Sequence, residues 1–289
     1  FTLKKYPQKI EKYFKLILSI NNIFIVMGLL TGMFLLKTYT GSHRFGYNGL
    51  IFAQNEASYI FILSITTFYY RRFYLGFKEI FFWIVLIPAL IVGTKAVYLF
   101  LVLLLLFHLF KKIPIKKLIT SLFVGSLLGY LVFHAMLNKI LLNAWQVFMY
   151  LYHKKGLLFA LTSGRNEFIE KKLEPLVFGK WLPPNFIFGG QDVVYYYTEM
   201  GFIDLVLFFG PVGAIFYSLI YFKLINLLSF RKDFKLFFSV SLFIIIFTSG
   251  HYFDSSIVGF YFIVFLLLNK KFPVVEAIKF KNNYLISKS

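Results

Sequence analysis

Long apolar segments separated by short basic stretches are the feature that most limits how this chain can fold. A membrane-spanning helix needs roughly 20 mainly apolar residues. Segments near that length lie at 16–36, 50–70, 118–137 and 202–222, and shorter ones form two pairs, 80–94 with 96–110 and 236–250 with 254–269. Only 15% of the residues are charged, and no single soluble core could bury so many Phe and Leu side chains. The sequence therefore predicts an all-α, polytopic bundle of about eight transmembrane helices.

The distribution of Lys and Arg predicts which loops face the cytoplasm, because basic loops are retained on that side. Eight spans place 21 of the 31 Lys and Arg residues on one side of the membrane. These residues occupy segments 1–15, 71–78, 111–117, 223–235 and 270–289. Most Asp and Glu residues lie on the other side. Both termini are therefore expected in the cytoplasm, and topology explains the net charge of +19 without a nucleic-acid partner.

The start of the chain and its residue types set further limits. The first residue is Phe1 and no cleavable signal pattern is present, so we expect a single integral-membrane domain, 1–289, that lacks N-terminal spans of a longer protein. Because the chain has no cysteine, disulfides, thiolate metal sites and cysteine nucleophiles are excluded. No metal-ligand cluster with recognisable spacing is present, and we expect neither a metal nor a cofactor.

The two short pairs of spans end in polar tips, which contain Lys95 in one pair and His251 in the other. About 15 helical residues reach only ~22 Å, which is short of the ~30 Å hydrocarbon core. Polar groups at that depth are tolerated only against protein or water, so we expect an outward-opening cavity at the tips. The alternative is that the helices extend into flanking residues such as 73–79, so that they cross the membrane fully and the tips are ordinary loops.

The segment 138–195 is too long for an ordinary connection and is predicted to be a large outer loop that contains short helices. Residues 140–152 favour a helix lying in the membrane interface, with Trp145 at headgroup level. If this helix spanned the membrane instead, the last third of the chain would change sides.

A second part of this loop points to anion binding. Thr162 or Ser163 can cap a helix whose first turn contains Arg165. Free backbone donors, the positive end of the helix dipole and a guanidinium group together suit a phosphate. The alternative is a capped helix in which Arg165 pairs with a carboxylate such as Glu167 or Glu170.

Polar residues from six distant stretches are all predicted to lie on the outer side. They are Arg44, Asn55, Glu56, Lys95, Arg165, Gln191, Asp192, Glu199, Asp204 and His251. Ionisable groups near the membrane are functional by default, although a structural pair of Glu56 with Arg44 or Lys95 is the alternative for that carboxylate. Within span 202–222, the motif 210–213 (Gly-Pro-Val-Gly) predicts a kink and a point of close packing.

These motifs resemble the bacterial O-antigen and capsular polysaccharide polymerases and ligases (Wzy and WaaL type), which are integral-membrane C-type glycosyltransferases. The shared features are Arg44 and Asn55, Gly93-Thr94-Lys95, Ser163-Gly164-Arg165, Glu199-Met200 with Phe202-Ile203-Asp204, Gly210 with Gly213, and Gly250-His251. The resemblance covers residues 40–269 approximately. The chain departs from the family at Gln191-Asp192, where ligases usually carry a His, and family members usually have more than eight spans.

The resemblance implies that an oligosaccharide repeat unit is transferred from undecaprenyl diphosphate to an acceptor sugar hydroxyl at the outer face of the bacterial plasma membrane. The cations Arg44, Lys95 and Arg165 would bind the diphosphate without a metal. The general base or the group that orients the acceptor would be His251, Asp204 or Glu199. The residues that contact the sugar or support the catalytic residues would be Asn55, Glu56, Gln191 and Asp192. The expected partners are the lipid-linked oligosaccharide, membrane lipid and a chain-length regulator.

Other functions fit parts of the sequence. An O-antigen-type ligase of the same fold would use the same groups. A transporter or flippase of lipid-linked glycan would show internal repeats and charges at mid-membrane depth, whereas this chain has no clear repeat and its charges gather at one face. A structural subunit would not need Arg165, Lys95 and His251 on one side. Glycosyl transfer is the function that the one-sided pattern favours.

Overall fold

The computed structural model describes residues 7–39, 44–112, 145–157, 181–190 and 198–270, together with 142, 159–160, 164–167 and 169–170. Its helices are α1 (Pro7–Thr31), the 3-10 helix η2 (Phe34–Leu36), α2 (Gln54–Phe73), α3 (Phe81–Val92), α4 (Lys95–Lys112), α7 (Asn185–Phe188), α8 (Gly201–Asn226), α9 (Lys232–Thr248) and α10 (Ser256–Asn269). Residues 145–157 are also helical. Over these ranges the chain forms helices and isolated bridges but no strand, which confirms the predicted all-α class.

Each predicted span except 118–137 falls on one of these helices, and 118–137 lies outside the described residues. Two helices, α1 and α8, are long and apolar enough to cross a membrane. Only 33% and 22% of their apolar windows are buried, so most of their nonpolar surface faces away from the protein. The core helix of a soluble protein would be mostly covered, and these two helices therefore indicate association with a membrane.

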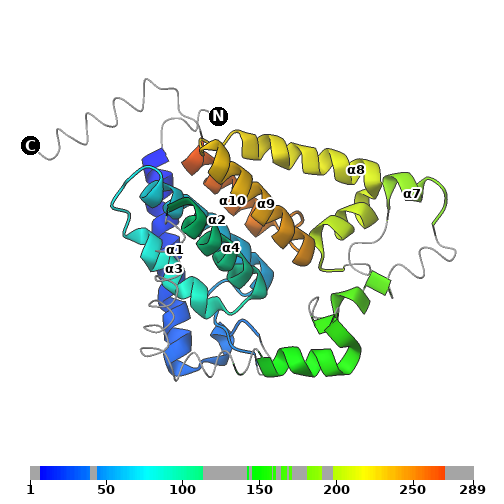
Figure 1. The fold of residues 1–289 in the computed structure, drawn as a ribbon, viewed down its shortest axis with the longest axis horizontal. Coiled ribbons are helices and arrows are strands. Elements are labelled where there is room, and N and C mark those ends of the chain that lie inside the picture. The colour runs from blue at the N-terminus through cyan, green and yellow to red at the C-terminus, as the bar shows by residue number, and fades with distance from the viewer. Residues whose placement is uncertain are drawn as a thin grey trace, which may run out of the picture.

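α2 is the central helix of the bundle, where it packs against α3, α4 and α10 (Figure 1). Every residue from Ala57 to Tyr70 is buried, so this part of the helix has no face left for solvent or lipid. Its buried hydroxyls bond to backbone carbonyls one turn back, as Ser64 does to Ile60 at 2.7 Å. Aromatic side chains from α9 and α10 fill the space around it.

Charged side chains of the bundle gather at its two ends. At one end, Glu11 of α1 accepts from Arg71 of α2 at 2.7 Å, and Lys111 of α4 lies 3.5 Å from Asp233 of α9. The Arg71 guanidinium also donates to the carbonyl of Leu268 in α10. The start of α1, the end of α2, the end of α4, the start of α9 and the end of α10 therefore share this end.

The predicted kink in α8 is confirmed at Gly210, whose φ of 67° and ψ of 173° are not helical and which precedes Pro211. The short helix α7 packs against the bend (Figure 1). There, the backbone N–H of Gly190 donates to the carbonyl of Phe208 at 3.0 Å. A Cβ atom at Gly210 would lie 2.0 Å from the carbonyl oxygen of Ile187, so only glycine permits this contact.

Candidate functional site

The first turns of α2 bring the tips of both short hairpins together. The Ser58 hydroxyl donates a hydrogen bond of 2.7 Å to the hydroxyl of Thr94, which lies between α3 and α4. The Tyr59 hydroxyl donates one of 2.8 Å to the carbonyl oxygen of Ser249, which follows α9. Because Ser58 and Tyr59 are consecutive and fully buried, the two tips are fixed beside the same part of one helix.

A cavity of about 520 Å³ lies at this end of the bundle. Its lining residues are Thr38, Tyr39, Arg44, Phe52, Ala53, Gln54, Asn55, Glu199 and His251. Arg44, Asn55, Glu199 and His251 were predicted as site residues, and the structure brings them to one cavity from three separate parts of the chain. The predicted cavity at the hairpin tips is therefore present beside His251.

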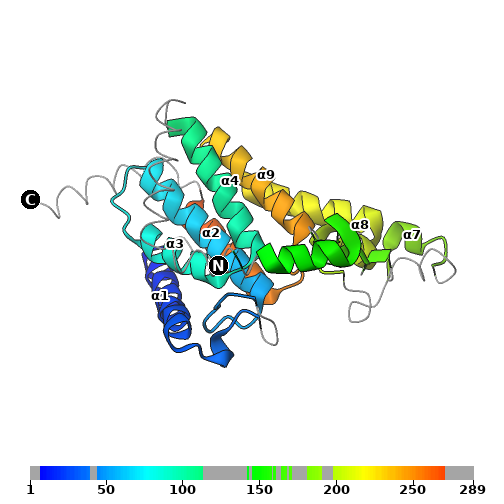
Figure 2. The same ribbon diagram turned by 60° about the horizontal axis from the view of Figure 1, so that its bottom comes forward.

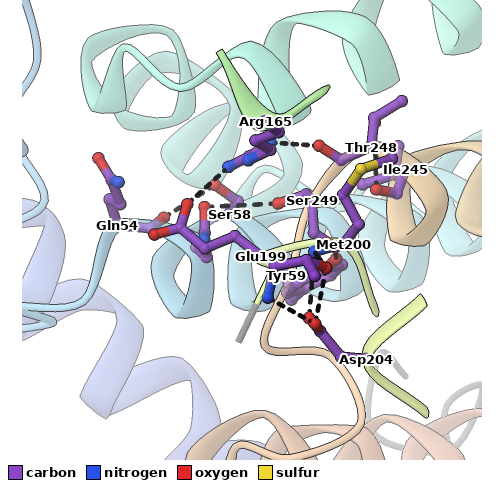
Figure 3. Close-up of polar contacts among 12 residues, drawn as sticks. Gln54, Ser58, Tyr59, Arg165, Glu199, Met200, Asp204, Ile245, Thr248 and Ser249 are labelled. Carbon is purple, nitrogen blue, oxygen red and sulfur yellow. Dashed lines mark hydrogen bonds and ion pairs between the residues drawn. The ribbon is translucent and has the colours of Figure 1, made fainter. Parts of the chain in front are cut away.

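Arg165 links residues 164–167 to Glu199, which lines this cavity (Figure 3). Its Nη2 atom lies 3.3 Å from Oε2 of Glu199, and its Nη1 atom donates to the carbonyl oxygen of Thr248 at the end of α9. Its partner is thus a carboxylate 34 residues away, whereas the nearby Glu167 pairs with Lys155. Arg165 is also the first helical residue after Gly164, as predicted.

Two further cations lie close to Arg165. The guanidinium carbon of Arg44 lies 5.3 Å from the ring centroid of Tyr39 in the cavity lining. Lys95 is not among the lining residues, and its Nζ atom donates to the carbonyl oxygen of Ala160 at 3.3 Å. The positive charges of Arg44 and Arg165 both act on the Lys95 ammonium. The three predicted diphosphate-binding residues are therefore near enough for their charges to interact. Lys95 is the first residue of α4, which packs against α2 and α9 (Figure 2).

His251 is held by an acidic neighbour. Its Nδ1 atom lies 3.2 Å from Oδ2 of Asp254 in the α9–α10 loop. This hydrogen bond raises the pKa of His251 above its ordinary value, burial opposes the shift, and the negative charges of Asp254, Glu199 and Glu56 add to it. A histidine oriented in this way through Nδ1 directs Nε2 elsewhere, as a general base requires.

The backbone at the site is held in uncommon conformations. Glu199 has a φ of 59° and His251 a φ of 70°, which are the positive φ values of non-glycine residues in the described parts of the chain. Gly250 allows the two segments to meet, since a Cβ atom there would lie 2.8 Å from Cα of Glu199. Such conformations cost of order 1–3 kcal/mol each and persist where the surroundings fix them, often at functional sites.

The remaining predicted site residues differ in placement. Asp204 is buried and is not among the cavity-lining residues: its carboxylate accepts hydrogen bonds from the backbone N–H of Thr198 at 2.7 Å and of Met200 at 3.1 Å (Figure 3). Glu56 accepts from the Ser255 hydroxyl at 2.5 Å. Asn55 lines the cavity, and its Oδ1 atom lies 3.4 Å from the hydroxyl of Ser249. Gln191 and Asp192 lie outside the described residues.

Several residues of the site were not predicted from the sequence, among them Asp254, Tyr39 and Gln54. Asp254, which orients His251, had a signal, because a carboxylate three residues after a histidine can reach it within one turn. Tyr39 and Gln54 had none, since nothing distinguishes Tyr39 among 20 tyrosines, and Gln54 lies in a polar helix start. The parts of the chain that the structure describes contain no group of three His, Asp or Glu side chains placed to hold a metal ion.

Comparison with known proteins adds no relative: no family model, no curated protein and no solved structure matches the chain. Function is therefore argued from the site itself. The site combines clustered cations, an acid-oriented histidine and a hollow large enough for part of a substrate. Cations in such a site stabilise negative charge, and a histidine oriented by a carboxylate can accept a proton.

Proposed function

We propose that the protein is a metal-independent membrane glycosyltransferase that polymerises lipid-linked oligosaccharide repeat units. The observation that carries the proposal is the position of the Arg165 guanidinium, which lies at the edge of the cavity lined by His251 and is tied to it through Glu199. A donor phosphate and an acceptor hydroxyl must approach the same carbon atom, and this arrangement offers a cation for the first and a base for the second.

We further propose that the chain spans a bacterial plasma membrane eight times, with both termini in the cytoplasm. The gathering of charges at two ends of the bundle supports this topology, as does the apolar surface of α1 and α8. The end that holds Glu11, Arg71 and Asp233 would face the cytoplasm, and the cavity would face outward. The eighth span of this proposal is segment 118–137, which lies outside the described residues.

The donor in this proposal is an oligosaccharide on undecaprenyl diphosphate. As the bond between the anomeric carbon and the phosphate oxygen breaks, negative charge develops on the leaving diphosphate. Arg165 and Arg44 have guanidinium groups suited to paired phosphate oxygens, and Lys95 adds a third positive charge. Fixed cations of this kind can take the place of a metal ion at the leaving group.

The acceptor is a sugar hydroxyl of a second lipid-linked chain. Its oxygen attacks the anomeric carbon, its proton passes to Nε2 of His251, and undecaprenyl diphosphate departs. Asp254 holds the imidazole in place through Nδ1 and stabilises the imidazolium that forms. In the same proposal, Asn55 contacts the sugars, while Glu56 and Asp204 position the α9–α10 loop and segment 198–200.

Reconstitution would test this function. Purified protein in lipid nanodiscs, supplied with undecaprenyl-diphosphate-linked repeat units, is expected to produce a ladder of glycan lengths. A product that carries only one transferred unit, on a different acceptor, would identify a ligase that uses the same chemistry. Movement of the lipid-linked units across a vesicle membrane without new glycosidic bonds would contradict the proposal in favour of transport.

A further inference from the structure

Glu199 occupies the position that an anionic ligand of Arg165 would need. The Arg165 side chain is only 19% exposed, and both of its terminal nitrogens are engaged, one by the Thr248 carbonyl and one by the Glu199 carboxylate. Of these two partners, the carbonyl belongs to the fixed end of α9. The Glu199 side chain is 51% exposed and lines the cavity, so it can be displaced.

From this arrangement we infer that Glu199 is an internal stand-in for the donor diphosphate, which displaces it from Arg165 on binding. The inference rests on the proposed function for the identity of the donor. A carboxylate carries one negative charge, whereas a diphosphate presents several oxygens and more charge to the clustered cations. Replacement of Glu199 by the diphosphate is therefore favourable when the donor binds. When the cavity holds no donor, Glu199 neutralises the charge of Arg165.

The displaced carboxylate remains next to His251. In the free protein the charge of Glu199 already favours the protonated imidazole, together with the charges of Asp254 and Glu56. Arg44 lines the same cavity, and Arg165 pairs with Glu199. Once Arg165 pairs with phosphate, it no longer neutralises Glu199. The full negative charge of Glu199 then helps His251 to accept the proton of the acceptor hydroxyl. Binding of the donor thus prepares the base.

The backbone at Glu199 supports a role beyond packing. Its φ of 59° is a conformation that asparagine adopts more readily than glutamate, and Gly250 is packed directly against it. The Asp204 carboxylate fixes both flanking residues, Thr198 and Met200. The main chain is therefore held while the side chain of Glu199 is left exposed enough to move.

Binding and kinetics test the inference separately from the proposed function. Undecaprenyl diphosphate and inorganic diphosphate are titrated into the wild type, Glu199→Gln, Glu199→Asn and Glu79→Gln in nanodiscs. Glu79 pairs with Lys15 at 3.1 Å at the opposite end of the bundle, so Glu79→Gln is the matched control for loss of a paired carboxylate. The asparagine variant removes the charge in a residue that suits the backbone, and unfolding temperatures verify that each protein is folded.

Both Glu199 variants are expected to bind undecaprenyl diphosphate up to about fivefold more tightly, because a partly exposed ion pair changes an equilibrium constant by about this factor. Glu79→Gln is expected to bind as the wild type does. In polymerisation they are expected to lower KM for the donor and also to lower kcat. Unchanged or weaker binding by both variants, or no binding by any protein, overturns the inference. Tighter binding without polymerisation by the wild type upholds the exchange and overturns only the proposed function.

Discussion

Arg165 is the residue on which the anion-binding part of the site depends. It is one of three clustered cations, and it is tied to Glu199 in the cavity wall and to the end of α9. Arg165→Ala is expected to reduce polymer formation by about two to three orders of magnitude, as loss of one charge-stabilising group typically does. Protein abundance in the membrane should not change. The measurement is the rate of glycan elongation at equal amounts of protein.

Lys155 provides the control for Arg165. It is exposed, its partner is Glu167, and it belongs to the helical segment 145–157 rather than to the cavity lining. Lys155→Ala should therefore retain polymerisation within about twofold, because an exposed ion pair contributes little. Equal losses in Arg165→Ala and Lys155→Ala would show that general charge, and not the guanidinium at the cavity, matters.

His251 sets the expected pH dependence. Its pKa is raised chiefly by the hydrogen bond that its imidazole donates to the Asp254 carboxylate, so the imidazole stays protonated to a higher pH than a free histidine does. A protonated imidazole cannot act as a base, and polymerisation should therefore fall as the pH drops through this raised pKa. Asp254→Asn removes the main cause of the shift and should move the acidic limb of the rate profile to lower pH. An unmoved limb would exclude His251 as the titrating group.

Sequence reasoning identified the polar residues of the site better than their roles. A charge pattern on one side of a membrane requires no knowledge of contacts, and it led to Arg44, Glu199 and His251. The partner of each group depends on how distant segments fold back. The contact of Arg165 with Glu199 and the turning of Asp204 toward segment 198–200 could not be read from spacing along the chain.

At the scale of elements, the approach of the α9–α10 loop to segment 198–200 determines whether the site is assembled. Gly250→Ala places a methyl group 2.8 Å from Cα of Glu199, so one of the two segments must shift. Overpacking of this kind typically costs about 1–3 kcal/mol. We expect a lower unfolding temperature and a large loss of polymerisation, both measured on protein in the same nanodiscs.

Gly259 in α10 offers a matched substitution. A Cβ atom there would meet nothing within 4 Å, and the residue lies inside a helix, where alanine is favoured over glycine. Gly259→Ala should therefore leave polymerisation unchanged and keep or slightly raise the unfolding temperature. If Gly259→Ala were as damaging as Gly250→Ala, the close approach at Glu199 would not be the cause.

The elements themselves were largely predictable, because apolar length and turn-forming residues are local properties. The kink at Gly210 followed from the adjacent Pro211. The gathering of both hairpin tips on α2 was not predictable, since it depends on the hydrogen bonds of Ser58 and Tyr59 with residues far along the chain. Local signals define helices, whereas the site arises from how they are packed together.

At the scale of the whole molecule, the absence of cysteine makes the proposed topology directly testable. A single cysteine introduced at an exposed position reports its side of the membrane without background. Lys154 is exposed in the helical segment next to the cavity end, and Lys232 is exposed at the start of α9, at the other end. Each replacement removes one surface charge and touches no residue of the site.

In intact cells, a membrane-impermeant maleimide is expected to label Lys154→Cys and to leave Lys232→Cys unmodified until the cells are opened. This result follows because an odd number of spans separates the two positions in the eight-span topology, with the basic end retained in the cytoplasm. Labelling of both variants in intact cells, or of neither, would place the two ends of the bundle on one side. The charged ends could not then be the two membrane faces, and the cavity of Arg165 and His251 would lose its outward position.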